Sequence, residues 1–125
     1  MQDFSKFKKS LLTIDHYIYA LCEVDGENRT PFYIGKGVND RCLQHLKEKK
    51  DSPKKEVIER LLEKNSLGID ILRHGIKTDK TAKLIEATCI DLLGIGELSN
   101  KVRGSGSEMG RATIEEIHNL KSGEL

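Results

Sequence analysis

The sequence has little of several features that would define its class at once. Its 125 residues include no tryptophan, two prolines and three cysteines, and no pair of cysteines has the C-x-x-C spacing of common zinc and redox sites. No run approaches the roughly 20 apolar residues that a membrane span needs, and the charged residues near its start are not typical of a secretory signal. We therefore expect one compact cytoplasmic domain with reduced, buried thiols and no membrane partner.

The charges are nearly balanced, because 21 lysines and arginines stand against 20 aspartates and glutamates. A net charge of +1 neither indicates nor excludes a nucleic-acid partner. The chain also lacks a G-x-x-x-x-G-K-[ST] motif, which excludes a P-loop nucleotide site. A functional prediction must therefore come from particular side chains.

Hydrophobic periodicity predicts helices and strands that follow one another closely along the chain. We expect helices in residues 1–12, from residue 39 onward, and in residues 51–65, 78–94 and 113–121, with strands in residues 15–23, 31–35 and 69–74. The expected N-caps are Asn39 or Asp40, Ser52, Thr78 or Asp79, and Thr113 with Glu116, and the expected glycine stops are Gly35, Gly37, Gly68, Gly94 and Gly96. This order predicts an α/β protein of the α+β type, with a small three-stranded antiparallel sheet flanked by helices.

Two tyrosine-bearing strands are the most unusual local feature. The Asp25-Gly26 turn joins the HYIYALCE segment to PFYIGKG in a hairpin, so that Tyr19 and Tyr33 become near cross-strand neighbours. Two phenols on one face can converge on a site. Alternatively, both tyrosines pack the core, because aromatic residues favour strands in any case.

A cluster of basic residues follows the second of these strands. Lys36 lies between two glycines, and Arg41 and His45 are four residues apart on the next helix, which places them on one face. The arginine fork suits a phosphate, and a histidine can exchange protons near neutral pH. The alternative is that Arg41 and His45 lie on a solvated helix face.

Glu86 lies in the apolar stretch LIEATCI, where an unpaired buried charge is costly. A metal ion or a basic partner would explain it. The alternative is a glutamate at the helix rim, or one paired with a lysine such as Lys83. Asn100, after this helix, either caps a turn or holds a ligand.

These elements together resemble the GIY-YIG endonuclease superfamily. They are YIY at residues 17–19, YIG at residues 33–35, Lys36, the R-x-x-x-H step at residues 41–45, Glu86 in a helix and Asn100 after it. The segment PFYIGKG is most similar to the LEM-3-like branch and its small bacterial relatives. The resemblance covers about residues 15–101 of one expected domain, residues 1–125, with the helix in residues 1–12 and the loop and helix in residues 102–125 as additions. Tyr17 replaces the first glycine of the GIY triplet.

The resemblance implies a metal-dependent endonuclease that hydrolyses phosphodiester bonds in DNA. Glu86 would hold a single divalent ion, Mg²⁺ or Mn²⁺. Tyr19 would be the general base that activates water, and Tyr33 would position water or phosphate.

The remaining positions would support this chemistry. Lys36 and His45 would help hold Tyr19 in a reactive state, Arg41 would contact the scissile phosphate, and Asn100 would brace the site. A tyrosine ordinarily has a pKa of about 10, so we expect nearby positive charge from Lys36, Arg41 and the metal to lower the pKa of Tyr19.

The DNA-binding surface is less sharply defined. Residues 36–64 include nine lysines and arginines against six acidic residues, and Arg103 and Arg111 add two more basic side chains. No zinc finger or recognition helix is visible, so we expect selectivity for DNA structure over sequence. Two alternatives stay open: a noncatalytic nucleic-acid-binding module with the same fold, and a small α/β protein with a satisfied polar cluster. The sequence leaves a monomer and a homodimer equally open.

Overall fold

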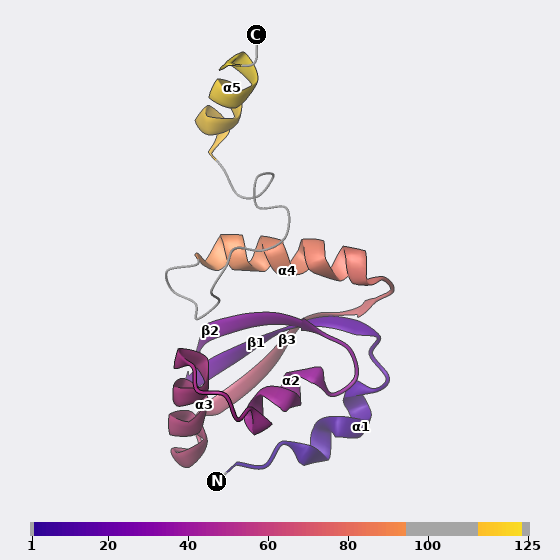
Figure 1. Ribbon diagram of the computed structural model, residues 1–125, viewed down its shortest axis with the longest axis vertical. Helices are drawn as coiled ribbons and strands as arrows, with labels where there is room; N and C mark the ends of the chain where they lie inside the picture. Colours follow the sequence, from indigo (N-terminus) through magenta and orange to yellow (C-terminus); the bar gives the residue numbers. More distant parts are fainter. Residues whose placement is uncertain (1, 95–112, 124–125) are drawn as a thin grey trace.

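A computed structural model describes residues 2–94 and 113–123 of the chain (Figure 1). The strands are β1 (His16–Asp25), β2 (Asn28–Gly37) and β3 (Leu67–Ile76), and the helices, with η for a 3-10 helix, are η1 (Ser5–Phe7), α1 (Lys8–Leu11), α2 (Arg41–Gln44), η2 (His45–Lys47), α3 (Pro53–Glu63), α4 (Asp79–Leu93) and α5 (Ile114–Gly123). The loop expected from residue 102 to the last helix lies outside the described residues. Within the two described ranges, no helix is long and apolar enough to cross a membrane.

The three strands form one antiparallel sheet in the order β2-β1-β3. The predicted fold class, a three-stranded antiparallel sheet flanked by helices, is therefore confirmed. β1 and β2 form the predicted hairpin, and both strands are longer than expected from the sequence. β1 is the central strand and most of its side chains are buried, while β2 and β3 are the edge strands.

Alternate side chains of β1 belong to two separate hydrophobic cores. Tyr17, Tyr19 and Leu21 lie in one core, and Ile18 and Ala20 lie in the other. The first core is completed by buried residues of α1, α2 and α3, namely Leu11, Cys42, Leu43, Ile58, Leu61 and Leu62. The second is completed from α4 by Ala82 and Ile90. Figure 1 shows this division, with α4 on one side of the sheet and α1, α2 and α3 on the other.

Most of the predicted helix ends are confirmed. Ser52, Thr78 and Thr113 each accept a hydrogen bond, at 3.1, 3.2 and 3.0 Å, from the backbone N–H three residues further on. Pro53 begins α3, where its missing N–H costs nothing. Gly94 ends α4 with a φ of 86°, a left-handed value that glycine adopts easily.

The prediction that Gly37 ends the second strand is confirmed, but the same prediction for Gly35 is wrong, because Gly35 lies inside β2. Gly35 and Gly37 lie opposite Tyr19 and Tyr17 of β1. A Cβ atom at Gly35 would lie 2.5 Å from the phenolic oxygen of Tyr19, and one at Gly37 would lie 2.9 Å from the ring of Tyr17. The glycines therefore make room for two tyrosine rings and do not form a turn.

The expected cap at Asn39 or Asp40 is also not formed. No side chain caps the start of α2, and Asn39 has a φ of 56° in the turn before it. Instead, the Tyr17 hydroxyl donates to the carbonyl of Asn39 at 2.7 Å and accepts from the backbone N–H of Cys42 at 3.2 Å. Tyr17, which replaces the first glycine of the GIY triplet, thus accepts the hydrogen bond from the Cys42 N–H that a capping side chain would have accepted.

The prediction that Gly68 stops the preceding helix is wrong as well. α3 ends at Glu63, and the chain turns at Asn65, whose φ of 55° is a conformation that asparagine tolerates. Gly68 lies in β3, where an added Cβ would be 2.6 Å from the guanidinium of Arg29. The added Cβ would also lie 2.6 Å from Cγ2 of Val24, so the side chains of Arg29 and Val24 leave little room for a larger residue at position 68.

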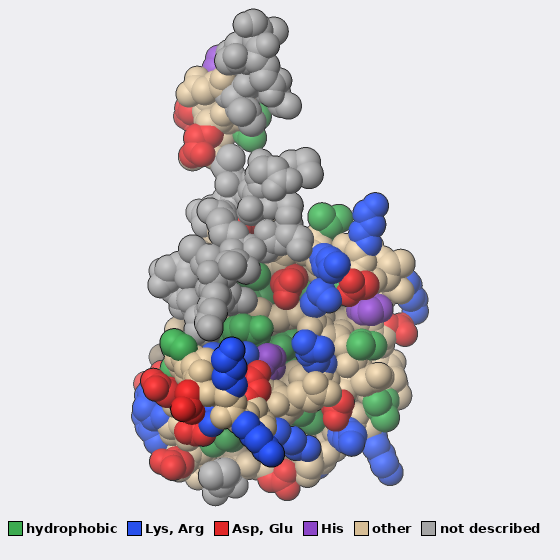
Figure 2. Space-filling model, viewed as in Figure 1, with side chains coloured by type: hydrophobic (Ala, Val, Ile, Leu, Met, Phe, Trp, Pro, Cys, Tyr) green, Lys and Arg blue, Asp and Glu red, His purple; other side chains and the backbone are tan. Residues whose placement is uncertain are grey.

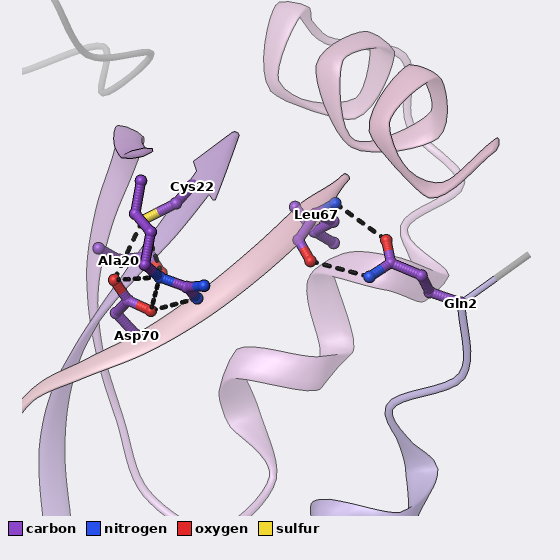
Figure 3. Close-up of polar contacts among 6 residues, drawn as sticks. Gln2, Ala20, Cys22, Leu67 and Asp70 are labelled. Carbon is purple, nitrogen blue, oxygen red and sulfur yellow. Dashed lines mark hydrogen bonds and ion pairs between the residues drawn. The ribbon is translucent and has the colours of Figure 1, made fainter. Parts of the chain in front are cut away.

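Polar contacts tie β3 to the rest of the molecule (Figure 3). The Gln2 side chain donates to the carbonyl of Leu67 at 3.0 Å and accepts from its N–H at 2.9 Å. Arg29 of β2 donates from Nε to the Asp70 carboxylate of β3 at 2.9 Å. Because β2 and β3 are on opposite sides of β1, this ion pair spans the whole sheet.

The cysteines are free thiols. Cys22 and Cys42 are buried, but Cys89 on α4 is partly exposed, so the expectation of three buried thiols is wrong for Cys89. Burial, with a smaller effect of Asp70, raises the pKa of Cys22 to about 12. A thiol with this pKa is unreactive at neutral pH.

Candidate active site

One cleft of about 260 Å³ contains most of the predicted site residues. Those that line it are Tyr19 of β1, Tyr33 and Lys36 of β2, Arg41 and His45 at the start of α2 and η2, and Glu86 of α4. Residues His16, Val38 and Asp79, which the sequence argument missed, complete the lining with Gly35 and Gly37. Asn100 lies outside the described residues.

The strand register brings the two tyrosines together. Tyr33 pairs with Leu21 and Gly35 pairs with Tyr19, so the tyrosines are diagonal neighbours across the hairpin. Their ring centroids are 6.3 Å apart. The predicted proximity of Tyr19 and Tyr33 is therefore confirmed, and Tyr19, which is also part of the core, shows that packing and site formation are compatible.

Gly35→Ala is expected to destabilise the fold by about 1–3 kcal/mol, the usual cost of overpacking a close-packed site. The added methyl would meet the Tyr19 hydroxyl and ring carbon at 2.5 and 2.6 Å, so the ring must move. Urea denaturation measures the change. The matched control is Thr30→Ala, an exposed change in the same strand, expected to stay within about 0.5 kcal/mol of wild type. Equal stability of Gly35→Ala and wild type would contradict the packing argument.

The His45 ring packs against both tyrosines. Its ring centroid is 5.6 Å from that of Tyr19 and 5.1 Å from that of Tyr33, and its Nε2 atom is hydrogen-bonded to the phenol of Tyr19. The side chain is 9% exposed. His45 is thus a buried histidine in direct contact with the predicted general base.

Two further charged residues contact the Nδ1 atom of His45. Glu48 Oε1 is 2.7 Å from His45 Nδ1, and Lys54 Nζ is 3.0 Å from the same carboxylate oxygen and 3.1 Å from Nδ1. The Lys54 ammonium also lies 4.6 Å from the ring centroid of Tyr33, a cation–π distance. The sequence argument assigned no role to Glu48 or Lys54, which lie in a charge-rich stretch with no distinguishing pattern.

Burial controls the protonation of the Tyr19–His45 pair. Burial raises the pKa of Tyr19 well above its usual value, and the nearby charge of Arg41 only partly opposes this. Burial also lowers the pKa of His45, although Glu48 acts in the opposite direction. The expectation that positive charge lowers the pKa of Tyr19 is therefore wrong for the metal-free protein: near pH 7 Tyr19 is a neutral phenol and His45 a neutral imidazole.

Lys36 has a partner on α4. Its Nζ atom is 2.8 Å from Asp79 Oδ1, and Lys83 lies 3.5 Å from the other oxygen of Asp79. Within the described part of the chain, no hydrogen bond joins Lys36 to Tyr19. The structure therefore places His45, and not the Lys36 ammonium, at the phenol.

The Glu86 carboxylate is half-buried and lines the cleft. Burial raises its pKa, while the charge of Lys36 and a hydrogen bond from the Lys36 backbone oppose the rise. Lys83, the alternative partner considered above, pairs with Asp79, and none of the described lysines or arginines forms an ion pair with Glu86. A partly desolvated carboxylate without a cation is a suitable ligand for a hard divalent ion.

The Arg41 side chain is exposed where it borders the cleft. Among the described residues, no carboxylate forms an ion pair with its guanidinium. Its five donors therefore remain available for an anion that enters the cleft, and a phosphate accepts two of them in parallel.

The rest of the surface has mixed charge. On the face that Figure 2 shows, lysines and arginines are interspersed with aspartates and glutamates. The described residues also contain no group of three or more histidine, cysteine or acidic side chains placed to hold a metal ion. A divalent ion in this cleft would thus take one carboxylate from the described protein and complete its shell with water and substrate oxygens, as Mg²⁺ commonly does.

A small antiparallel sheet with two tyrosines, an arginine, a histidine and a glutamate around one edge cleft is the arrangement of a nuclease-type GIY-YIG domain. The family model for the LEM-3-like GIY-YIG domain matches residues 29–123, more than half of the chain. No curated protein and no solved structure matches. The chain belongs to the LEM-3-like GIY-YIG domain family.

Proposed function

We propose that the protein is a metal-dependent endonuclease that hydrolyses phosphodiester bonds in DNA. The observation that carries this proposal is the convergence in one cleft of three groups: the Tyr19 phenol, hydrogen-bonded to His45, the Arg41 guanidinium and the Glu86 carboxylate. Neither the guanidinium nor the carboxylate forms an ion pair with any residue that the structure describes. Metal-dependent phosphodiester hydrolysis uses three functions of this kind: a proton acceptor for water, a cation for the phosphate oxygens and a ligand for a divalent ion.

Each residue has a distinct part in this reaction. Tyr19 takes the proton of the attacking water, and His45 receives the phenolic proton. Tyr33 orients the water or the phosphate from the neighbouring strand. Arg41 binds the nonbridging oxygens, where negative charge increases in the transition state.

Glu86 is the proposed ligand for Mg²⁺ or Mn²⁺. When bound, the ion supplies a Lewis acid that offsets the growing charge on the phosphate. Lys36 and Asn100 complete the proposed site: Lys36 keeps Asp79 neutralised beside Glu86, and Asn100 braces the cleft.

The proposed substrate is DNA recognised by its structure. Phosphate contacts from a surface with a modest basic excess position a duplex without reading its bases. None of the described elements forms a zinc finger, and selection among nicks, flaps and junctions depends on how the bent backbone fits the cleft. We propose that residues 1–125 act as one nuclease domain.

The test is cleavage of end-labelled linear, nicked, flapped and four-way-junction DNA with Mg²⁺, with EDTA, and with Glu86→Ala. The control is Glu63→Ala, which removes an exposed glutamate of α3. We expect products with wild type and Glu63→Ala in Mg²⁺, and none with EDTA or Glu86→Ala. Binding without cleavage under any divalent ion would favour the noncatalytic DNA-binding module, and neither binding nor cleavage would overturn both proposals.

A further inference from the structure

The Nδ1 atom of His45 has two neighbours with opposite hydrogen-bonding character. Glu48 lies at 2.7 Å and, as a carboxylate, can only accept. Lys54 lies at 3.1 Å and, as an ammonium, can only donate. One ring nitrogen cannot satisfy both groups, so the balance between Glu48 and Lys54 decides whether Nδ1 carries a proton.

The geometry favours Glu48. Its distance to Nδ1 is the shorter one, and its Oε1 atom also accepts from Lys54 at 3.0 Å, which engages the ammonium. We infer that Glu48 and Lys54 are positioning residues that keep the His45 proton on Nδ1, so that Nε2 is free to accept the phenolic proton of Tyr19. The tautomer follows from the contacts alone, whereas its consequence for cleavage rests on the proposed function.

The proton inventory of the step is balanced by this arrangement. The water oxygen bonds to phosphorus as the bond from phosphorus to the leaving oxygen breaks. The water proton moves to the Tyr19 oxygen while the phenolic proton moves to His45 Nε2. The resulting imidazolium keeps its Nδ1–H hydrogen-bonded to Glu48, and the charge of Glu48 stabilises the imidazolium. His45 later releases one proton to solvent, and the leaving oxygen takes one proton from solvent.

The opposite charges of the two residues predict opposite effects on pH dependence. The ionisable side chains facing His45 are Tyr19 of β1, Tyr33 of β2, Arg41 of α2, Glu48 beyond η2 and Lys54 of α3. Glu48 raises the pKa of His45, and Lys54 lowers it. Cleavage needs neutral His45, so Glu48→Gln should move the acid limb of kcat/KM to lower pH and Lys54→Met should move it to higher pH.

A double-mutant comparison separates this role from a structural one. In Glu48→Ala, Lys54 is the one hydrogen-bonding group left at Nδ1 among the described residues, so the proton should move to Nε2 and cleavage should fall about 100-fold. Adding Lys54→Met removes the competing donor, so the double variant should cleave at least about tenfold faster than Glu48→Ala. Glu48→Gln keeps an acceptor for Nδ1–H and should retain most of the wild-type rate.

The tautomer itself is measured by long-range ¹H–¹⁵N NMR of the metal-free protein at pH 7.5, with the His45→Gln spectrum used to assign the ring. We expect the Nδ1–H form in wild type and Glu48→Gln and the Nε2–H form in Glu48→Ala. An unchanged tautomer in Glu48→Ala, or pH limbs that shift in the same direction, would overturn the inference. If the tautomers behave as expected but wild type cleaves no DNA, the proposed function is wrong. The assignment of the His45 tautomer would then still hold, and only its consequence for cleavage would be lost.

Discussion

Tyr19→Phe is expected to bind DNA with unchanged affinity and to cleave it about 10²–10⁴-fold more slowly than wild type, the usual contribution of a positioned acid–base group. The substitution removes one oxygen atom, which lies in the cleft and is hydrogen-bonded to His45. Binding depends on phosphate contacts made by other side chains, so it should be retained. Single-turnover cleavage and fluorescence anisotropy on the same DNA measure the two quantities separately.

The high pKa of Tyr19 is compatible with a role as base. Burial keeps the phenol of Tyr19 neutral in the free protein. The lowered pKa of His45 keeps its imidazole neutral as well, so an unprotonated ring nitrogen lies beside the phenol. Tyr19 can thus take up a water proton only as it passes its own to His45, which makes the phenol a relay. Removing the hydroxyl breaks the relay at its centre.

Tyr33→Phe is the matched control for Tyr19→Phe. It removes a second phenol from the same cleft and leaves the hydrogen bond between Tyr19 and His45 in place. We expect a loss of about tenfold or less, since Tyr33 orients groups and transfers no proton. Thermal unfolding should show that both proteins are folded, with about 1 kcal/mol lost for the hydrogen bond of Tyr19. Cleavage by Tyr19→Phe at a rate near that of wild type would refute the assignment of the base.

Local sequence patterns predicted the helices and strands because those patterns depend on near neighbours. A serine or threonine three residues before a free backbone N–H caps a helix whatever lies elsewhere, so Ser52, Thr78 and Thr113 were correctly assigned. Gly35 and Gly68 were misassigned because their roles come from residues distant in sequence. The Tyr19 ring lies against Gly35, and the Arg29 side chain lies against Gly68.

The site shows the same division between local and distant information. The spacing of Arg41 and His45 predicted that they share one helix face, and the resemblance to the GIY-YIG superfamily implied that Glu86 joins them. The structure brings all three to one cleft. Glu48 is only three residues from His45, but it lies among other charged residues that gave no reason to select it. Lys54 could not be recognised, because it contacts His45 only after α3 packs beside η2. The pKa of Tyr19 was predicted with the wrong sign, since the sequence shows which charges are near a residue and does not show how deeply it is buried.

Glu86→Gln is expected to reduce cleavage by more than about 10³-fold while it leaves the fold intact or slightly more stable. The amide has the shape of the carboxylate without its charge. Because burial raises the pKa of Glu86, the unfolded chain ionises at lower pH than the native protein, so the native protein loses stability as pH rises through this interval. The neutral amide removes that penalty at pH 7.

Metal binding distinguishes loss of a ligand from loss of structure. A divalent ion that binds only the folded state should raise the stability of wild type by about 2.7 kcal/mol at 100 times its Kd. Glu86→Gln should show no such shift in Tm with Mg²⁺ or Mn²⁺. The matched control is Asp79→Asn, which changes a carboxylate of the same cleft that is already paired with Lys36 and Lys83.

Asp79→Asn should keep the metal-dependent shift in Tm, and the shift should occur at equal or lower ion concentration. The negative charge of Asp79 raises the pKa of Glu86, so its removal makes the Glu86 carboxylate easier to ionise and a better ligand. An equal shift in wild type and Glu86→Gln would place the ion elsewhere in the protein. A stabilised Glu86→Gln protein that neither responds to metal nor cleaves DNA would instead identify Glu86 as a residue retained for function at a cost in stability.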